Sequence, residues 1–111
     1  LKNMMGVMGG NRGQIHYNIS ECLVDLHRRL PTSLTVIDAT RVLLRNGPSG
    51  GNLSDVQALG KVFASADVVA ADVVAAERVF RWKAGDVAHI QKALEAKIGV
   101  TSPAQIRVVE A

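Results

Sequence analysis

A mixed α/β fold is predicted for this chain, with a sheet of about three or more strands packed by about three helices. Three observations predict it. Some runs carry apolar residues at helical spacing, and others are short, apolar and β-branched. The chain has 111 residues, of which 48% are hydrophobic, which suits one globular domain. We expect a single α/β domain over residues 1–111, forming the C-terminal part of a longer protein.

The first helix is expected over residues 19–30, where apolar residues recur with a helical period. Asn18 is the expected N-cap, and Glu21 three residues later would complete a capping box. Pro31 ends the helix, because the residue before a proline avoids helical backbone angles. Residues 1–17 are rich in Gly, Met and Asn and are expected to form a loop with one short ordered turn.

Three segments are expected to be strands because they are short and largely apolar. They are residues 34–39, extending towards Leu44, residues 61–65 and residues 106–109. Residues 53–60 fit neither the helical nor the strand pattern well, so their structure stays open.

A second helix is expected over residues 67–80, which are nearly all Val and Ala. Valine favours strands, but this run is longer than an ordinary strand. Its cap is expected to be Ser65 or Asp67. A third helix is expected over residues 87–98, capped by Asp86 and followed by a glycine suited to the C′ position.

Charge and hydropathy exclude two classes of partner. Thirteen basic and ten acidic residues give a net charge of +3, and the basic residues form no stripe with interleaved aromatics. We therefore expect no nucleic-acid partner. No apolar run approaches the roughly 20 residues that a membrane-spanning helix needs. No membrane partner is expected.

Metal chemistry has few ligands to draw on. Cys22 is the single cysteine, so the chain alone cannot hold an iron–sulfur cluster or a structural zinc, and we expect a small buried hydrophobe. The three histidines lack metal-ligand spacing, and His27 and His89 are expected at helix surfaces. We predict no metal site and no iron–sulfur cluster, while the cofactor and any catalytic residue remain unknown.

The glycine-rich stretch of residues 46–52 is the strongest candidate for a binding loop. Consecutive amides in such a turn can form an anion-binding concavity. The expected contacts are Asn46, Gly47, Gly50 and Gly51. The stretch matches neither the P-loop nor the dinucleotide fingerprint. Two interpretations stay open: a tight connection between elements, or a cradle for a phosphate or another ligand.

Three aspartates are candidate ligands. Asp72 lies within the expected buried helix and needs a partner or a raised pKa, so it could bind a cation or substrate, reach solvent, or pair with an arginine. Asp38 lies near the end of an expected strand, where ligands of open α/β sheets gather, or else caps the neighbouring loop. Asp67 is also a candidate ligand-binding residue. The alternative is that it is simply an acid in the first turn of a helix, where the helix dipole favours one.

Four polar residues lie in the glycine-rich N-terminal segment, which has little core-forming pattern. They are Lys2, Asn3, Arg12 and His16. We expect them to contact an anionic group or a substrate.

Several short blocks follow one another along the chain: Lys2-Asn3-Met4-Met5-Gly6, Arg12 with His16, Asp25-Leu26, Asp38-Ala39, residues 46–51, residues 65–72 and Val87-Ala88-His89-Ile90. In order and spacing they resemble DUF362, an uncharacterised prokaryotic family of domains of unknown function. The resemblance extends over almost the whole chain and looks like the C-terminal part of the full family domain. It implies no settled activity. Many members look like cytoplasmic proteins that carry ferredoxin-type four-iron clusters in an added cysteine-rich segment, a pattern from which this chain departs.

The leading hypothesis is a domain that binds a small anionic ligand, or catalyses a reaction on one, through the glycine-rich loop and nearby carboxylates. The alternative is a non-catalytic accessory or interaction module of an iron–sulfur electron-transfer protein. A third candidate is a purely structural or oligomerisation domain. The candidate partners are accordingly a small anionic molecule, the remainder of the parent protein and a second copy of the chain.

Overall fold

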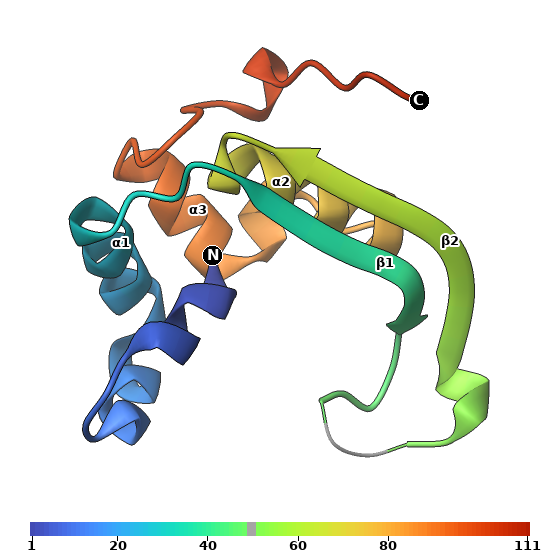
Figure 1. The fold of residues 1–111 in the computed structure, drawn as a ribbon, viewed down its shortest axis with the longest axis horizontal. Coiled ribbons are helices and arrows are strands. Elements are labelled where there is room, and N and C mark those ends of the chain that lie inside the picture. The colour runs from blue at the N-terminus through green and yellow to red at the C-terminus, as the bar shows by residue number, and fades with distance from the viewer. Residues whose placement is uncertain (49–50) are drawn as a thin grey trace.

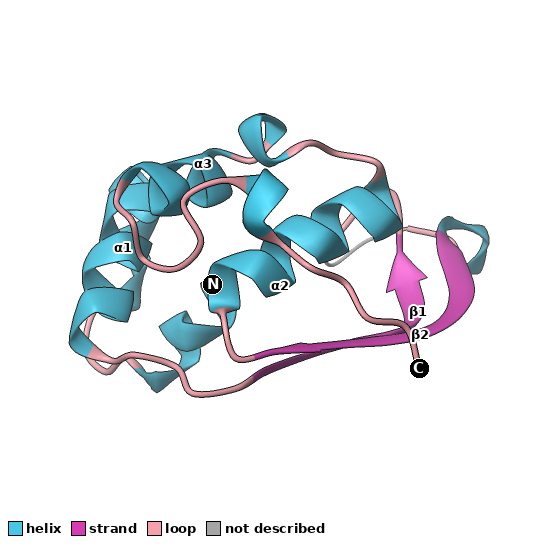
Figure 2. Cartoon of the chain, turned by 90° about the horizontal axis from the view of Figure 1, so that it is seen from above, coloured by secondary structure: helices cyan, strands magenta, loops and turns pink. Residues whose placement is uncertain are grey.

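The computed structural model describes residues 1–48 and 51–111 of the chain. It has two layers, with the helices on one face of a short sheet and the other face of the sheet uncovered (Figures 1 and 2). The mixed α/β class is confirmed. The principal elements are α1 (Ile19–Arg29), β1 (Thr35–Leu43), β2 (Val56–Ser65), α2 (Val68–Ala75) and α3 (Ala88–Glu95).

Short helical turns connect and flank these elements. Their bounds are η1 (Lys2–Val7), η2 (Arg12–Asn18), η3 (Leu53–Asp55), η4 (Ala76–Phe80), η5 (Ala84–Asp86) and η6 (Pro103–Gln105). The N-terminal segment thus holds two 3₁₀ turns where one short turn was expected. Within the described residues, no helix is long and apolar enough to cross a membrane.

The sheet consists of β1 and β2, which pair antiparallel from Thr35 opposite Ser65 to Leu43 opposite Val56. The register shifts around Thr40, where two residues of β2 face one of β1. One of those two is Gly60, whose φ of 62° suits a glycine in such a bulge. The bulge breaks the alternation of apolar residues, which explains why the first half of β2 was not recognisable.

The prediction of three or more strands is wrong for the described part of the chain, where the sheet has two strands. Residues 106–109 belong to no strand, although they are apolar and β-branched. A hollow of about 470 Å³ lies between Val62 of β2 and Val108 of the tail. Strand composition fits a pleated surface, but a strand forms only where a partner backbone lies within hydrogen-bonding reach.

Helix α2 crosses the inner face of the sheet and supplies much of the core. Val69 is fully buried, and Val73 is 4% exposed. Of the two expected caps, Ser65 and Asp67, the structure has Asp67, whose Oδ1 accepts from the amides of Val69 at 2.8 Å and Ala70 at 2.9 Å. Beyond α2 the chain continues as a wider π-helical turn, η4, and ends in the left-handed residue Arg81 at φ 62°.

Helices α1 and α3 pack against each other beside α2. Leu23 of α1 and Ile90 of α3 are 1% and 2% exposed and are among the most deeply buried side chains of the described residues. Helix α1 begins at Ile19 as predicted. The predicted capping box is wrong, however, because the side chain of Asn18 makes no hydrogen bond to the helix.

The start of α3 also differs from the prediction. Asp86 does not cap it, since its carboxylate accepts from the amide of Lys83 at 2.7 Å and closes the preceding turn η5. Val87 is the N-cap residue, without a side-chain bond. After the helix, Lys97 takes the left-handed conformation at φ 55° that was expected of the glycine two residues later.

Candidate functional site

A hollow of about 370 Å³ lies between η1, the beginning of β1, α2 and α3. Four of its lining residues carry polar side chains suited to binding: Lys2, Asn3, Asp72 and His89. Apolar residues of β1, among them Ile37, complete the wall. The hollow therefore combines an apolar wall with a few polar groups, the usual composition of small-molecule sites.

Asp72 reaches the hollow because it lies four residues after Val68, and residues four apart share one face of a helix. Val69 and Val73 point instead into the core. The Asp72 side chain is 18% exposed, and its Oδ2 accepts a hydrogen bond from the backbone nitrogen of Leu1 at 2.9 Å. The partner of this carboxylate is thus the charged amino group of Leu1 rather than the arginine considered from the sequence.

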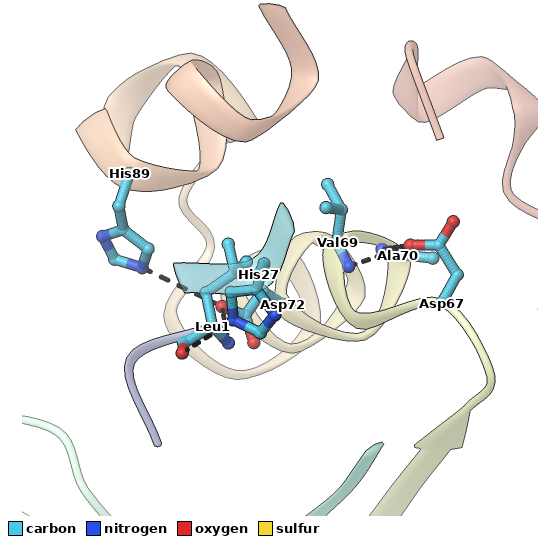
Figure 3. Close-up of polar contacts among 7 residues, drawn as sticks. All are labelled: Leu1, His27, Asp67, Val69, Ala70, Asp72 and His89. Atoms are coloured by element: carbon cyan, nitrogen blue, oxygen red, sulfur yellow. Dashed lines mark hydrogen bonds and ion pairs between the residues drawn. The ribbon is translucent and has the colours of Figure 1, made fainter. Parts of the chain in front are cut away.

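His89 extends from the first turn of α3 towards the same carboxylate (Figure 3). Its Nε2 lies 3.9 Å from Asp72 Oδ2, which is an electrostatic contact rather than a hydrogen bond. Burial lowers the pKa of His89 below its usual 6.5, the Asp72 carboxylate acts in the opposite direction, and Lys2 lowers the pKa further. A neutral imidazole beside a carboxylate is a competent proton acceptor.

His27 of α1 contacts Leu1 as well. Its ring is 4% exposed, and its Nε2 lies 3.1 Å from the carbonyl oxygen of Leu1. Leu1 is therefore held at its carbonyl by His27 and at its nitrogen by Asp72, as Figure 3 shows. The prediction of a surface position is wrong for His27, because the face of α1 that carries it is turned inward. Asp67 stands apart in the same view, at the beginning of α2.

The hollow brings together Lys2, Asn3 and Asp72 of the predicted site residues, and it adds His89, which the sequence did not single out. Arg12 and His16 belong to η2 and are not among the lining residues. The signal that could have identified His89 is weak, since an isolated histidine in a charged helix resembles any surface histidine.

Asp38 lies apart from the hollow, on the uncovered face of the sheet. It is an exposed residue within β1, and its Oδ1 accepts from the backbone nitrogen of Thr40 at 2.8 Å. That backbone hydrogen bond is the main reason why the pKa of Asp38 is lowered, with Arg41 nearby acting in the same direction. The argument from strand ends does not apply here, because an antiparallel pair has no common carboxyl edge.

The glycine-rich loop lies at the far end of β1, about 20 Å from the hollow if six residues of strand are counted at the usual rise (Figure 1). Of its predicted contacts, Gly50 lies outside the described residues. The described part is organised around the carboxylate of Asp55, which is 7% exposed. The loop and the hollow therefore cannot form one site.

Three donors converge on Asp55. Its Oδ2 accepts from Asn46 Nδ2 at 2.9 Å and from the amide of Asn52 at 3.3 Å, and its Oδ1 pairs with Arg45 at 3.1 Å. These contacts, led by the Asn46 bond, lower the pKa of Asp55 although burial opposes them. The donors of the loop thus bind the carboxylate of Asp55, which belongs to the loop itself.

Gly51 is required by the same carboxylate. Its φ is +114°, and a Cβ at this position would lie 2.9 Å from Asp55 Oδ2. Gly47 is described as well, and its nearest contact would be with the Leu43 side chain at 3.4 Å. Sequence reasoning missed Asp55, yet a signal was present, because an Asn three residues before an Asp is a capping-box spacing.

Asp67 has a structural role that uses both carboxylate oxygens. Besides the two helix amides, Oδ2 accepts from the backbone nitrogen of Val100 at 2.7 Å, so the residue joins α2 to the segment after α3. Gly99 permits this approach, since a Cβ there would collide with the carboxylate. Among the residues that the structure describes, no three His, Cys, Asp or Glu side chains are grouped to hold a metal ion.

Comparison with known proteins identifies the family. The family model described as "Domain of unknown function (DUF362)" matches residues 1–77. This range includes Lys2, Asn3 and Asp72 of the hollow, whereas His89 lies beyond it. Comparisons with curated proteins and with solved structures found no match. The chain belongs to the DUF362 family of domains of unknown function.

Proposed function

We propose that this domain binds a small anionic ligand in the hollow between η1, β1, α2 and α3. The observation that carries the proposal is the presence of Lys2, Asn3, Asp72 and His89 in one hollow of about 370 Å³. The glycine-rich loop is a weaker candidate for the anion, because Asn46 and Asn52 already donate to Asp55. The cytoplasm, which the family resemblance implies, is the proposed location.

Lys2 and Asn3 are the groups that would hold the anion. An ammonium and a carboxamide together donate several hydrogen bonds and supply one positive charge. Both residues are exposed at the rim of the hollow, so the ligand can enter without rearrangement of the core. Asp72 would repel an anion, and its place deeper in the hollow favours a ligand with its charge at one end and a polar, proton-bearing group at the other.

His89 and Asp72 provide the chemistry if the ligand is also a substrate. The lowered pKa keeps the His89 imidazole neutral at pH 7, as proton abstraction requires. Asp72 would then stabilise the imidazolium that forms, since opposite charges 3.9 Å apart attract. The reaction class consistent with this pair is proton transfer to or from the bound ligand.

An accessory or interaction module of an iron–sulfur electron-transfer protein is the second candidate. It is favoured by the uncovered face of the sheet, where Val36 and Val62 are each 60% exposed, and by Leu34 at 62%. Trp82, 52% exposed and stacked on Phe80 at 5.0 Å, adds a further apolar surface. Such a role predicts association with a partner protein and no ligand in the hollow.

Titration with inorganic phosphate, followed by backbone amide NMR, tests the first proposal. We expect saturable shifts at Lys2, Asn3 and His89. The Lys2→Gln variant should bind phosphate about tenfold more weakly, because a hydrogen bond to a charged group contributes about 1.5 kcal/mol. Lys61→Gln is the matched control, since Lys61 is exposed on β2 and does not line the hollow.

Two outcomes would contradict the proposal. Saturable shifts confined to Gly47 and Gly51 would assign the anion to the loop. Equal weakening by Lys2→Gln and Lys61→Gln would indicate a general charge effect rather than a site.

A further inference from the structure

A separate hollow of about 350 Å³ lies beside η4, the π-helical turn that follows α2. Its lining comes from two parts of the chain: Leu44, Gln57 and Leu59 at the sheet, and residues 78–82 at the end of η4 and just after it. The volume is that of a small-molecule site. Of the described residues, none lines both this hollow and that of the proposed function, so the two can be tested independently.

Two stacked aromatic rings form part of this lining. The ring centroids of Phe80 and Trp82 are 5.0 Å apart, and the ring planes differ by 23°. Arg81 permits the stack, because its left-handed backbone at φ 62° turns the chain back until the amide of Trp82 donates to the carbonyl of Ala76 at 3.1 Å. Trp82 remains 52% exposed beside Phe80, so its indole offers ring surface to a further planar group.

The charge of the hollow is positive. Arg78 and Arg81 are its charged lining residues among those that the structure describes. Arg81 forms no ion pair within residues 1–48 and 51–111. Arg78 Nη1 pairs with Glu110 at 3.1 Å, but the two side chains are 44% and 77% exposed, and such pairs contribute little. An anion in the hollow therefore meets one unpaired guanidinium and a second whose present partner is weakly held.

We propose that this hollow binds a small aromatic carboxylate. The ring of the ligand stacks on the indole of Trp82, and Leu44 and Leu59 supply aliphatic contacts. The carboxylate of the ligand pairs with the guanidinium of Arg81, whose planar N–H groups match two carboxylate oxygens. The side-chain amide of Gln57 is a further hydrogen-bond donor.

Other occupants fit less well. A cation would be repelled by the two arginines. Inorganic phosphate would use their charge but leave the aromatic rings and the leucines in contact with water. A neutral aromatic ring would cover the apolar surface and take the Arg81 guanidinium out of water without a partner, which costs free energy. The combination of a ring with a negative charge is therefore what selects the ligand.

Benzoate is the probe for this proposal. The indole N–H of Trp82 gives a single NMR signal in the ¹⁵N-labelled chain, because Trp82 is its one tryptophan. We expect this signal to shift saturably with sodium benzoate and not with sodium chloride of equal concentration. Two comparison ligands should each bind several-fold more weakly: cyclohexanecarboxylate has the charge without the aromatic ring, and benzyl alcohol has the ring without the charge.

Arg81→Gly removes the guanidinium and suits the left-handed backbone at φ 62°, so the turn should be retained. It should weaken benzoate binding about tenfold, the effect of one charge-assisted hydrogen bond. Lys97→Gly is the matched control, because Lys97 is an exposed cation at φ 55° that does not line the hollow. This variant should bind benzoate like the wild type.

Three outcomes would overturn the proposal. A Trp82 signal that fails to saturate, or that sodium chloride reproduces, would show that benzoate has no site here. Equal binding of benzoate and either comparison ligand would show that the hollow does not select an aromatic anion. Benzoate binding that Arg81→Gly leaves unchanged, or that Lys97→Gly weakens equally, would remove the role of Arg81. Should Arg81→Gly fail to fold, the comparison of the three ligands on the wild type decides.

Discussion

At the scale of single residues, the carboxylate of Asp67 explains why position 99 is a glycine. Asp67 caps α2 and also accepts a hydrogen bond from the backbone amide of Val100. This second bond places its carboxylate next to Gly99. The cap was predictable from an Asp before an apolar run. The contact with residues 99–100 was not, because no local pattern links positions more than 30 residues apart.

Substituting Gly99→Ala tests this contact. The added methyl group would collide with the Asp67 carboxylate and force either the cap or the bond to Val100 to move. We expect the free energy of unfolding to fall by about 1–3 kcal/mol, the usual cost of overpacking. Urea unfolding followed by circular dichroism measures it.

The control for that substitution is Gly85→Ala, where a Cβ would meet nothing within 4 Å. It should change stability by less than about 0.5 kcal/mol. Equal effects at the two glycines would contradict the assigned contact between Gly99 and the Asp67 carboxylate.

At the scale of elements, the segment between β1 and β2 is built around one buried acid. Asp55 accepts from Asn46 and Asn52 and pairs with Arg45, while its backbone oxygen accepts from Leu44 at 2.9 Å. These bonds hold the two strand ends together. A glycine-rich sequence predicts a turn here, but the group around which the turn forms lies beyond the glycines.

Asp55→Asn should lower the melting temperature by several degrees at pH 7 and reduce hydrogen-exchange protection at Leu44 and Val56. The pKa of Asp55 is lowered in the folded chain, so its ionised form stabilises the fold above its ordinary value of 3.8. That contribution is lost as pH falls through the lowered pKa. The difference between wild type and variant should therefore shrink in acid, which melting curves at several pH values would measure.

Asp25→Asn provides the comparison. The Asp25 side chain is 77% exposed, and its ion pair with Arg28 is long, at 3.7 Å. Exposed pairs of this kind contribute little, so its melting temperature should stay close to that of the wild type. If Asp55→Asn behaves like Asp25→Asn, the donors around Asp55 do not organise the loop.

At the scale of the whole molecule, the hollow between η1, β1, α2 and α3 exists only because these four elements meet. Lys2 and Asn3 come from η1, Asp72 from α2 and His89 from α3, with β1 as the wall. Figure 1 shows the N-terminus next to α3 and far from the glycine-rich loop. The single site expected from the sequence is therefore divided between opposite ends of β1.

Global stability should depend on His89. Its pKa is lowered in the folded chain, so the unfolded chain binds the proton more readily. Stability is then fully present above about pH 6.5 and falls as pH drops below that value, because the unfolded state binds more protons there. We expect His89→Gln to show a shallower loss of stability between pH 7 and pH 5 than the wild type, measured by urea unfolding.

His16→Gln is the appropriate control, since His16 is exposed on η2 and does not line the hollow. It should keep the wild-type dependence on pH. A wild-type slope in His89→Gln would contradict the assigned role of burial at this position.

The sequence by itself determined the α/β class, the position of α1, the core of β1 and the cap of α2. These features follow from local periodicity, β-branched composition and the hydrogen-bonding capacity of single side chains. It also indicated the family, because the family model matches residues 1–77, which hold all of the quoted blocks except residues 87–90.

Only the tertiary structure decided which polar residues line the same hollow. It placed Lys2, Asn3 and Asp72 with His89, buried His27 against the carbonyl of Leu1, and left residues 106–109 outside the sheet. The physical reason is common to all three. Burial, pairing and convergence depend on contacts between segments distant in the chain, and their energies are absent from any local pattern.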